Sequence, residues 1–487
     1  MKTGIQNFMI LAMMSIGTCA ISADLTPSGV IQPSTPAVPY GSRIQRTMRL
    51  LATSTPEHKN KVRILIYGQS ISCGPWCDAV VKKLKTDFPN ADLELENRQI
   101  GGFNANGLID TAEADLYPFY PDLVIFHVYG GTDDGAAGKM CTLEKLYRNL
   151  RSRTTAEMLT ITHHIVGSDD AGRDKWLKVH DNDSEVIRQL ADKYGYEVAD
   201  IRPDWKKHVD DNGGKQTTFL ADGTHLNPKG HELMASLVIP HLKFNPEQKQ
   251  SWREMVKAYT ADGKRWDSDK EELPSKGDLL SKPVKFQFDG NRVDLIAMPI
   301  KDGKPGTAKI LIDGKAPSTI PGVYATTRAS QAPKCWWPAL RRVEIGSDSV
   351  PVAEDWTLTF TKVNEKATEF EYELKGSVTG PDGNGDSKGK FTSKSGRMII
   401  DPKWFTITSA FINFKEAPKS GFEVKWSVVA KCADTWRPNP TPDPAKEDRA
   451  ILAQALTNSS HTLEIIPNGD GSLGLRAIVV YQPPVKE

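Results

Sequence analysis

The chain of 487 residues is longer than one hydrophobic core usually supports, so its length indicates two or three domains. Its 62 Lys and Arg residues balance 61 Asp and Glu residues. A chain this close to neutral lacks the basic excess typical of proteins that bind nucleic acid or anionic membranes, so neither partner is expected.

The N-terminus has the pattern of a secretory signal. Lys2 precedes an apolar stretch over residues 8–16, and small residues follow at positions 20–23, which predicts a signal peptide at 1–23. The apolar stretch is too short to cross a bilayer, so no membrane span is expected. The protein is therefore predicted to be secreted, to the periplasm or the outside. A lipoprotein anchor at Cys19 is the alternative, although Thr18 is bulkier than the residue usual before such a cysteine.

Residues 24–60 begin as a Pro/Ser/Thr-rich linker and end in a short amphipathic helix over 44–51, which we expect to pack on the domain that follows. Apolar runs then alternate with helical patterns. The runs that suit buried parallel strands are 61–67, 92–96, 122–129, 158–163 and 196–201, and the helical patterns are 76–88, 143–150, 184–194 and 228–242. This alternation predicts a three-layer α/β/α domain with a doubly wound parallel sheet over 61–243.

Two motifs in this domain supply the residues of a serine hydrolase. Gly68-Gln69-Ser70 follows the first predicted strand directly, and Asp222 stands three residues before His225. A serine hydroxyl is a weak nucleophile, so it needs an imidazole to take its proton and a carboxylate to orient that imidazole. The sequence therefore predicts Ser70, His225 and Asp222 as nucleophile, general base and orienting acid. Either motif alone could also be a helix cap or a turn.

With these motifs, residues from about 60 to 243 resemble the SGNH, or GDSL-like, hydrolases. The first block of the family matches Gly68-Gln69-Ser70, with Gln69 where the name-giving motif has Asp, and the last block matches Asp222 and His225. The resemblance implies an oxyanion hole built from the Ser70 amide, the Gly102 amide and an asparagine side chain. That asparagine is missing here.

The block that should hold the asparagine reads Gly130-Gly131-Thr132-Asp133-Asp134. Thr132 and Asp133 are the two candidates for its position. A threonine hydroxyl can donate a hydrogen bond to an oxyanion, whereas an ionised aspartate can only accept one. His127 and Tyr129, on the preceding strand end, are candidate substitutes and, with Gln69, candidates to line the site.

The sequence predicts no cofactor and no metal. His163 and His164 form a pair typical of ligands, but at a predicted strand end we expect one to face the core and the other the loop. Cys73 and Cys77 lack the further ligands that a zinc site needs.

The pattern changes after residue 243. Residues 244–280 are charged and predicted to form a helical linker, and 281–487 hold short β-type runs separated by turn residues, which predicts a β-sandwich with room for one sheet-forming insertion. Cys335 and Cys432 are candidates for a disulfide in this region. The region also holds several tryptophans. Trp336 and Trp337 are the best candidates to stack on sugar rings, because adjacent residues of a strand cannot both point inward.

Together these features predict a secreted esterase of the SGNH type that removes acetyl or other small acyl groups from a polysaccharide. A lipid or aryl esterase of the same fold is one alternative. The other is an exported, non-catalytic carbohydrate-binding protein that lost its activity with the third-block asparagine.

Overall fold

The computed structural model describes residues 39–135, 139–167, 173–248, 254–267, 273–300, 304–347 and 349–486. The predicted signal peptide, residues 1–23, lies outside them.

A five-stranded parallel sheet forms the centre of the N-terminal domain, in the order β2-β1-β3-β4-β5. The strands are β1 (Lys61–Gly68), β2 (Asp92–Asn97), β3 (Leu123–His127), β4 (Glu157–Ile161) and β5 (Glu197–Ala199). Each one coincides with a predicted apolar run, which confirms the three-layer α/β/α class.

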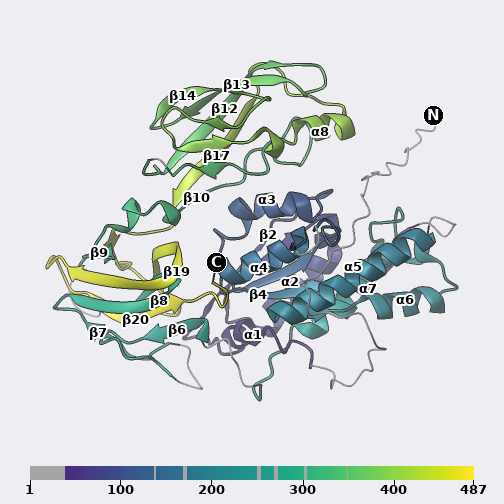
Figure 1. The fold of residues 1–487 in the computed structure, drawn as a ribbon. Coiled ribbons are helices and arrows are strands. Elements are labelled where there is room, and N and C mark those ends of the chain that lie inside the picture. Colours follow the sequence, from purple (N-terminus) through teal and green to yellow (C-terminus); the bar gives the residue numbers. More distant parts are fainter. Residues whose placement is uncertain are drawn as a thin grey trace.

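Seven helices of the described residues cover the two faces of this sheet (Figure 1). They are α1 (Gln45–Ala52), α2 (Pro75–Asp87), α3 (Ala105–Asp115), α4 (Thr142–Arg153), α5 (Arg173–Tyr194), α6 (Arg202–Asp211) and α7 (Pro228–Val238). Alternate residues of β1 serve opposite faces. Leu65 and Tyr67 pack in the cluster with α3, α4 and α5, and Ile64 and Ile66 pack in the cluster with α1, α2, α6 and α7.

Helix α1 confirms the helix predicted over 44–51, and it packs on the sheet domain as expected. The backbone N–H groups of Arg46 and Thr47 donate to the Glu157 carboxylate at 3.0 and 2.8 Å. Because free N–H groups at a helix start favour a negative charge, Glu157 fixes this helix at the start of β4.

A second, antiparallel sheet follows in the order β18-β9-β19-β8-β20-β6, with β7 paired to β20. Its strands are β6 (Val256–Tyr259), β7 (Asp278–Leu279), β8 (Val284–Ala297), β9 (Ala308–Ile312), β18 (Thr435–Trp436), β19 (Arg449–Pro467) and β20 (Gly474–Tyr481). The helical linker predicted over 244–280 is therefore wrong for its described residues. Strands β6 and β7 find their hydrogen-bond partner, β20, some 200 residues later in the sequence, and this tertiary pairing overrides the local helical preference.

Residues between β9 and β18 form a separate β lobe, which matches the insertion that the sequence allowed. One sheet runs β10-β17-β12-β13-β14, and a small one runs β11-β16-β15. The strands are β10 (Tyr324–Thr326), β11 (Glu344–Ile345), β12 (Glu354–Val363), β13 (Phe370–Gly376), β14 (Gly380–Asp386), β15 (Phe391–Thr392), β16 (Met398–Ile400) and β17 (Glu423–Ala430), with helix α8 (Ile407–Phe414). In Figure 1 this insertion lobe stands over α3 of the N-terminal domain.

Two further features concern the described residues. Cys335 and Cys432 are both free thiols, so the disulfide considered for them is wrong. Cys335 lies in the insertion lobe, whereas the backbone of Cys432 forms an isolated antiparallel β-bridge with Ala453 of β19 in the second sheet. No helix in the described ranges has the length and apolarity needed to cross a membrane.

Candidate active site

Ser70 stands on a sharp turn at the carboxyl end of β1. Gly68 precedes it with φ +151°, and a Cβ atom at Gly68 would collide with the carbonyl oxygen of His127 on the neighbouring strand. Only glycine therefore fits at this approach of two strands. Gln69 then caps the short 3₁₀ turn Ser70–Ser72, because its Oε1 accepts the N–H of Ile71 at 3.3 Å.

Ser70, His225 and Asp222 form a continuous hydrogen-bonded chain. The Ser70 Oγ lies 3.0 Å from Nε2 of His225, and Nδ1 of His225 lies 2.8 Å from Oδ2 of Asp222. Oδ1 of Asp222 also accepts the backbone N–H of His225 at 2.8 Å and that of Thr224 at 3.1 Å. Partial burial would raise the pKa of Asp222, but these hydrogen bonds from His225 and Thr224 outweigh it and hold the pKa below its usual value. The carboxylate is therefore ionised at neutral pH.

This chain of three residues is open to solvent. The side chains of His225 and Asp222 are 51% and 58% exposed, and Ser70 is half-buried. An ester group carried by a large molecule can reach Ser70 without passing through an enclosed tunnel.

A buried histidine supports the loop that carries Asp222 and His225. Nε2 of His164 donates to the carbonyl oxygen of Thr224 at 2.8 Å, and the N–H of Gly167 donates to the Gly223 carbonyl at 2.7 Å. Burial lowers the pKa of His164 to about 4, so the ring is neutral and keeps its N–H on the loop. The segment after β4 thus fixes the position of the catalytic loop.

A second row of buried side chains lies behind the nucleophile. Nε2 of Gln69 donates to Nδ1 of His127 at 3.0 Å, and Nε2 of His127 lies 3.4 Å from Nδ1 of His163. Since an amide nitrogen can only donate, the proton of neutral His127 sits on Nε2. Burial lowers the pKa of His127 and of His163 well below the usual value.

The predicted site-lining residues belong to this row. Gln69 is buried and contacts the Ser70 hydroxyl from behind, with Oε1 at 2.8 Å from Oγ, and the buried His127 contacts Gln69. Tyr129 is half-buried against His163. His163 and His164 are both fully buried: His163 contacts His127 in the interior, and His164 contacts the loop of Asp222 and His225 through Thr224. Among the described residues no cluster of His, Cys, Asp or Glu has the geometry to hold a metal ion.

Thr132 is not available as an oxyanion donor, which corrects one of the two candidates for the missing asparagine. Its side chain is buried, and its hydroxyl donates to Oδ1 of Asp183 at 2.5 Å. The hydroxyl has a single proton, so that bond occupies it. Asp133 is half-buried, and as a carboxylate it can only accept, so its role stays a prediction.

Gly102, the predicted backbone donor, lies under Trp337 of the insertion lobe, and its neighbour Gly101 lies beside Ser70 and Trp336. A Cβ atom on Gly101 would lie 3.5 Å from Cβ of Ser70, and one on Gly102 would lie 3.1 Å from the Trp337 ring. Indole Nε1 of Trp336 and indole Nε1 of Trp337 each donate to the Gly101 carbonyl oxygen at 2.7 Å. The sequence did not reveal this contact, because 235 and 236 residues separate its partners.

The two tryptophans have different surroundings. Trp337 is 7% exposed and packs against Phe103, with ring centroids 5.7 Å apart, so its predicted sugar-stacking role is wrong. Trp336 is 54% exposed, so its ring is accessible, as the prediction required. The ring lies near Ser70, with Gly101 between them. Neither residue lies in a strand, so the alternation expected of strand neighbours does not apply.

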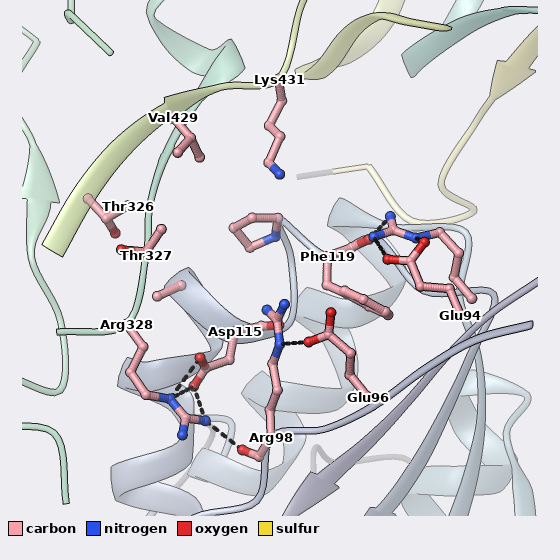
Figure 2. A pocket seen from close by; sticks show the side chains of 13 residues that line it. Glu94, Glu96, Arg98, Asp115, Phe119, Thr326, Thr327, Arg328, Val429 and Lys431 are labelled. Carbon is pink, nitrogen blue, oxygen red and sulfur yellow. Dashed lines mark hydrogen bonds and ion pairs between the residues drawn. The ribbon is translucent and has the colours of Figure 1, made fainter. Parts of the chain in front are cut away.

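A cavity of about 570 Å³ lies at the seam between the N-terminal domain and the insertion lobe, and the Ser70–His225–Asp222 chain does not line it. Figure 2 shows Arg328 of the lobe reaching across this seam. Its guanidinium pairs with the buried Asp115 at 2.8 Å and donates to the carbonyl oxygen of Arg98 at 2.6 Å. This contact anchors the lobe segment that continues to Trp336 and Trp337.

At the carboxyl edge of the parallel sheet, a serine, a histidine and an aspartate form one hydrogen-bonded chain, which is the arrangement that serine hydrolases use. Residues 66–233 match the model of the GDSL-like Lipase/Acylhydrolase family. This segment therefore matches the SGNH-type domain that the motifs indicated, and the match supports a carboxylic ester hydrolase activity for it. A comparison with curated proteins finds no significant match.

Solved structures with a similar arrangement include the acetylxylan esterase Axe2 from Geobacillus stearothermophilus, at 18% identity and a TM-score of 0.31, covering 40% of this chain and 100% of that one. Another is LAE5, an α/β hydrolase from the metagenome of Lake Arreo, Spain, at 19% identity and a TM-score of 0.31, covering 39% of this chain and 98% of that one. Similarities of this size define neither a substrate nor a mechanism for this chain.

Proposed function

We propose that the protein is an exported acetylesterase that removes acetyl or similarly small acyl groups from a polysaccharide by a Ser-His-Asp mechanism. The observation that carries the proposal is the hydrogen-bonded chain from Ser70 through His225 to Asp222. Export is proposed from the sequence of residues 1–23 alone.

In this mechanism Ser70 attacks the acyl carbonyl while His225 takes the hydroxyl proton. The ionised Asp222 holds the imidazole with Nδ1 protonated and stabilises the imidazolium that forms. The oxyanion of the tetrahedral intermediate is bound by the amides of Ser70 and Gly102. His225 returns its proton to the leaving alcohol, and water then releases the acyl group from Ser70 by the same steps.

Two features favour a sugar polymer as the carrier of the ester. The site is open, so that a long chain can lie across it, and the exposed Trp336 ring stands beside Ser70. An indole face offers an apolar surface to the C–H groups of a pyranose ring, and its edge keeps a polar N–H.

Release of acetate from acetylated polysaccharides tests the substrate. We expect acetate release from at least one member of a panel of acetylated plant and algal polysaccharides, with the rate on p-nitrophenyl esters falling as the acyl chain grows from two to eight carbons. Trp336→Ala should slow the reaction on polymer more than the reaction on p-nitrophenyl acetate. A preference for long acyl chains, with no acetate from any polymer, would contradict the proposal and favour a lipid esterase.

A further inference from the structure

The peptide bond between Gly101 and Gly102 accepts hydrogen bonds at its carbonyl oxygen, whereas its N–H donates none to the described residues. Its carbonyl oxygen accepts two indole N–H groups, from Trp336 and Trp337, at 2.7 Å each. Its N–H group, that of Gly102, has no acceptor within the part of the chain that the structure describes. Gly101, the first residue of this peptide, lies beside Ser70, since a Cβ atom on it would stand 3.5 Å from Cβ of Ser70.

Peptide geometry couples these two ends. No cis peptide bond occurs in the described residues, and in a planar trans peptide the C=O and N–H vectors point in opposite directions. Two donors that fix the oxygen of Gly101 therefore also fix the direction of the Gly102 N–H. Hydrogen bonds accepted by a carbonyl also polarise its peptide and strengthen the N–H as a donor.

The two indoles are themselves held firmly. The Phe414 ring of α8 packs edge-on against Trp336 and Trp337, with centroid separations of 4.9 and 5.2 Å. Eight residues before Trp336, Arg328 binds the Arg98 carbonyl and Asp115 across the seam (Figure 2). The insertion lobe therefore hydrogen-bonds both ends of the segment from Arg98 to Gly101: Arg328 binds the Arg98 carbonyl, and the two indoles bind the Gly101 carbonyl.

The same stretch is tied to the strand that carries the nucleophile. The N–H of Arg98 bonds to the Ile66 carbonyl, and the N–H of Ile100 bonds to the Gly68 carbonyl, both at 2.9 Å. The distance between Ser70 and the Gly102 peptide is thus set by β1 on one side and by the insertion lobe on the other.

The orientation of the Gly102 N–H matters for stabilising the oxyanion, because this chain lacks the asparagine that supplies a side-chain donor in the family. The Thr132 hydroxyl is occupied by Asp183, so the backbone amides must stabilise the oxyanion without the usual side-chain donor. Loss of a single oxyanion donor typically costs about a hundred- to a thousandfold in kcat. An amide that is fixed in advance is worth more than one that must reorient during the reaction.

We propose that Trp336 and Trp337 are positioning residues for the oxyanion hole, in which the insertion lobe holds the Gly101 carbonyl so that the Gly102 N–H points at the developing oxyanion. The inference rests on the proposed ester hydrolysis at Ser70. It gives the C-terminal part of the chain a role in catalysis itself, separate from any binding of sugar by the exposed face of Trp336.

Tryptophan-to-phenylalanine variants test it, because phenylalanine keeps an aromatic ring and removes the N–H. We expect W336F and W337F each to lower kcat for p-nitrophenyl acetate modestly, since one donor remains. The double variant should lower kcat by at least about tenfold, with KM changed less than about threefold, because the donor acts on the transition state. Affinity for a trifluoromethyl ketone that forms an oxyanion adduct with Ser70 should fall in parallel with kcat/KM.

Trp356→Phe is the matched control. Trp356 is a buried tryptophan of the same lobe whose indole N–H has no hydrogen-bond partner among the described residues, so W356F should leave kcat unchanged. If wild type is active and the double variant keeps kcat and ketone affinity within twofold of W356F, the positioning role is wrong. An inactive wild type would instead contradict the proposed esterase function. Since Trp336 is exposed, W336F alone gives a folded variant in which a reduced kcat supports the proposal and an unchanged one, together with an unchanged W337F, overturns it.

Discussion

The hydroxyl proton of Ser70 has two acceptors within reach, Nε2 of His225 at 3.0 Å and Oε1 of Gln69 at 2.8 Å. Only the first leads to catalysis, because an amide oxygen is too weak a base to take the proton. Gln69 holds the hydroxyl next to His225 while its own amide nitrogen is fixed on the neutral His127. A glutamine in place of the name-giving aspartate of the family thus links the nucleophile to the buried histidine row.

Asp183 predicts a pH dependence of stability. Burial raises its pKa to about 6, against about 3.9 in an unfolded chain. The folded protein therefore binds more protons than the unfolded one between about pH 4 and 6, and this carboxyl makes stability fall as pH rises through that window. The contribution is on the order of 3 kcal/mol.

Asp183→Asn removes this titration and keeps an oxygen to accept the Thr132 hydroxyl. We expect wild type to lose stability relative to Asp183→Asn as the pH rises from 4 to 7. The free energy of unfolding of each protein, measured by urea unfolding at each pH, would therefore give a difference, variant minus wild type, that increases with pH. Parallel pH curves for the two proteins would contradict this prediction, because they would show that the carboxyl of Asp183 ionises as it does in the unfolded chain.

At the scale of elements, the catalytic loop depends on the segment after β4. His164 donates to the Thr224 carbonyl in the middle of the loop that carries Asp222 and His225. The ring is neutral over the working pH range, because its pKa is lowered to about 4 by burial. Without this bond, the Gly167–Gly223 hydrogen bond would still join the loop to the segment after β4.

His164→Ala is therefore expected to lower kcat about tenfold, because small displacements of catalytic groups cost one to two orders of magnitude. His164→Gln, whose amide nitrogen can reach the position of Nε2, should recover part of that loss. His180→Ala is the control, since His180 stacks on Tyr129 with centroids 5.0 Å apart. Equal kcat values for His164→Ala and His180→Ala, as measured on p-nitrophenyl acetate, would show that the loop needs no tether from His164.

The helices and strands of the structure can be compared with those that the sequence predicts. The five parallel strands were predicted because each is a continuous apolar run. Ser70, Asp222 and His225 were predicted because Gly68-Gln69-Ser70 and Asp222-x-x-His225 are each short local motifs. Helices α3 and α6 were missed, since their burial depends on packing against the sheet. The linker predicted as helix became β6 and β7 because β20, far along the chain, supplies the partner edge. Local patterns predict local elements, and long-range pairing can override them.

At the scale of the whole molecule, the C-terminal part of the chain reaches into the active site. The insertion lobe contributes Trp336 and Trp337 to the surroundings of Ser70 and ties itself to the N-terminal domain through Arg328 and Asp115. No periodicity or spacing in a single sequence carries this information, because the contacts join residues more than 200 positions apart. The sequence thus indicated that the oxyanion hole was altered, and only the fold shows what surrounds it.

The central claim is that Ser70, activated by His225 and Asp222, hydrolyses esters. Turnover of p-nitrophenyl acetate by wild type, Ser70→Ala and Asp222→Asn tests it most directly. We predict that Ser70→Ala lowers kcat by at least about a thousandfold and that Asp222→Asn also lowers it strongly, because the asparagine favours the wrong tautomer of His225. Equal hydrolysis by wild type and Ser70→Ala would contradict the account.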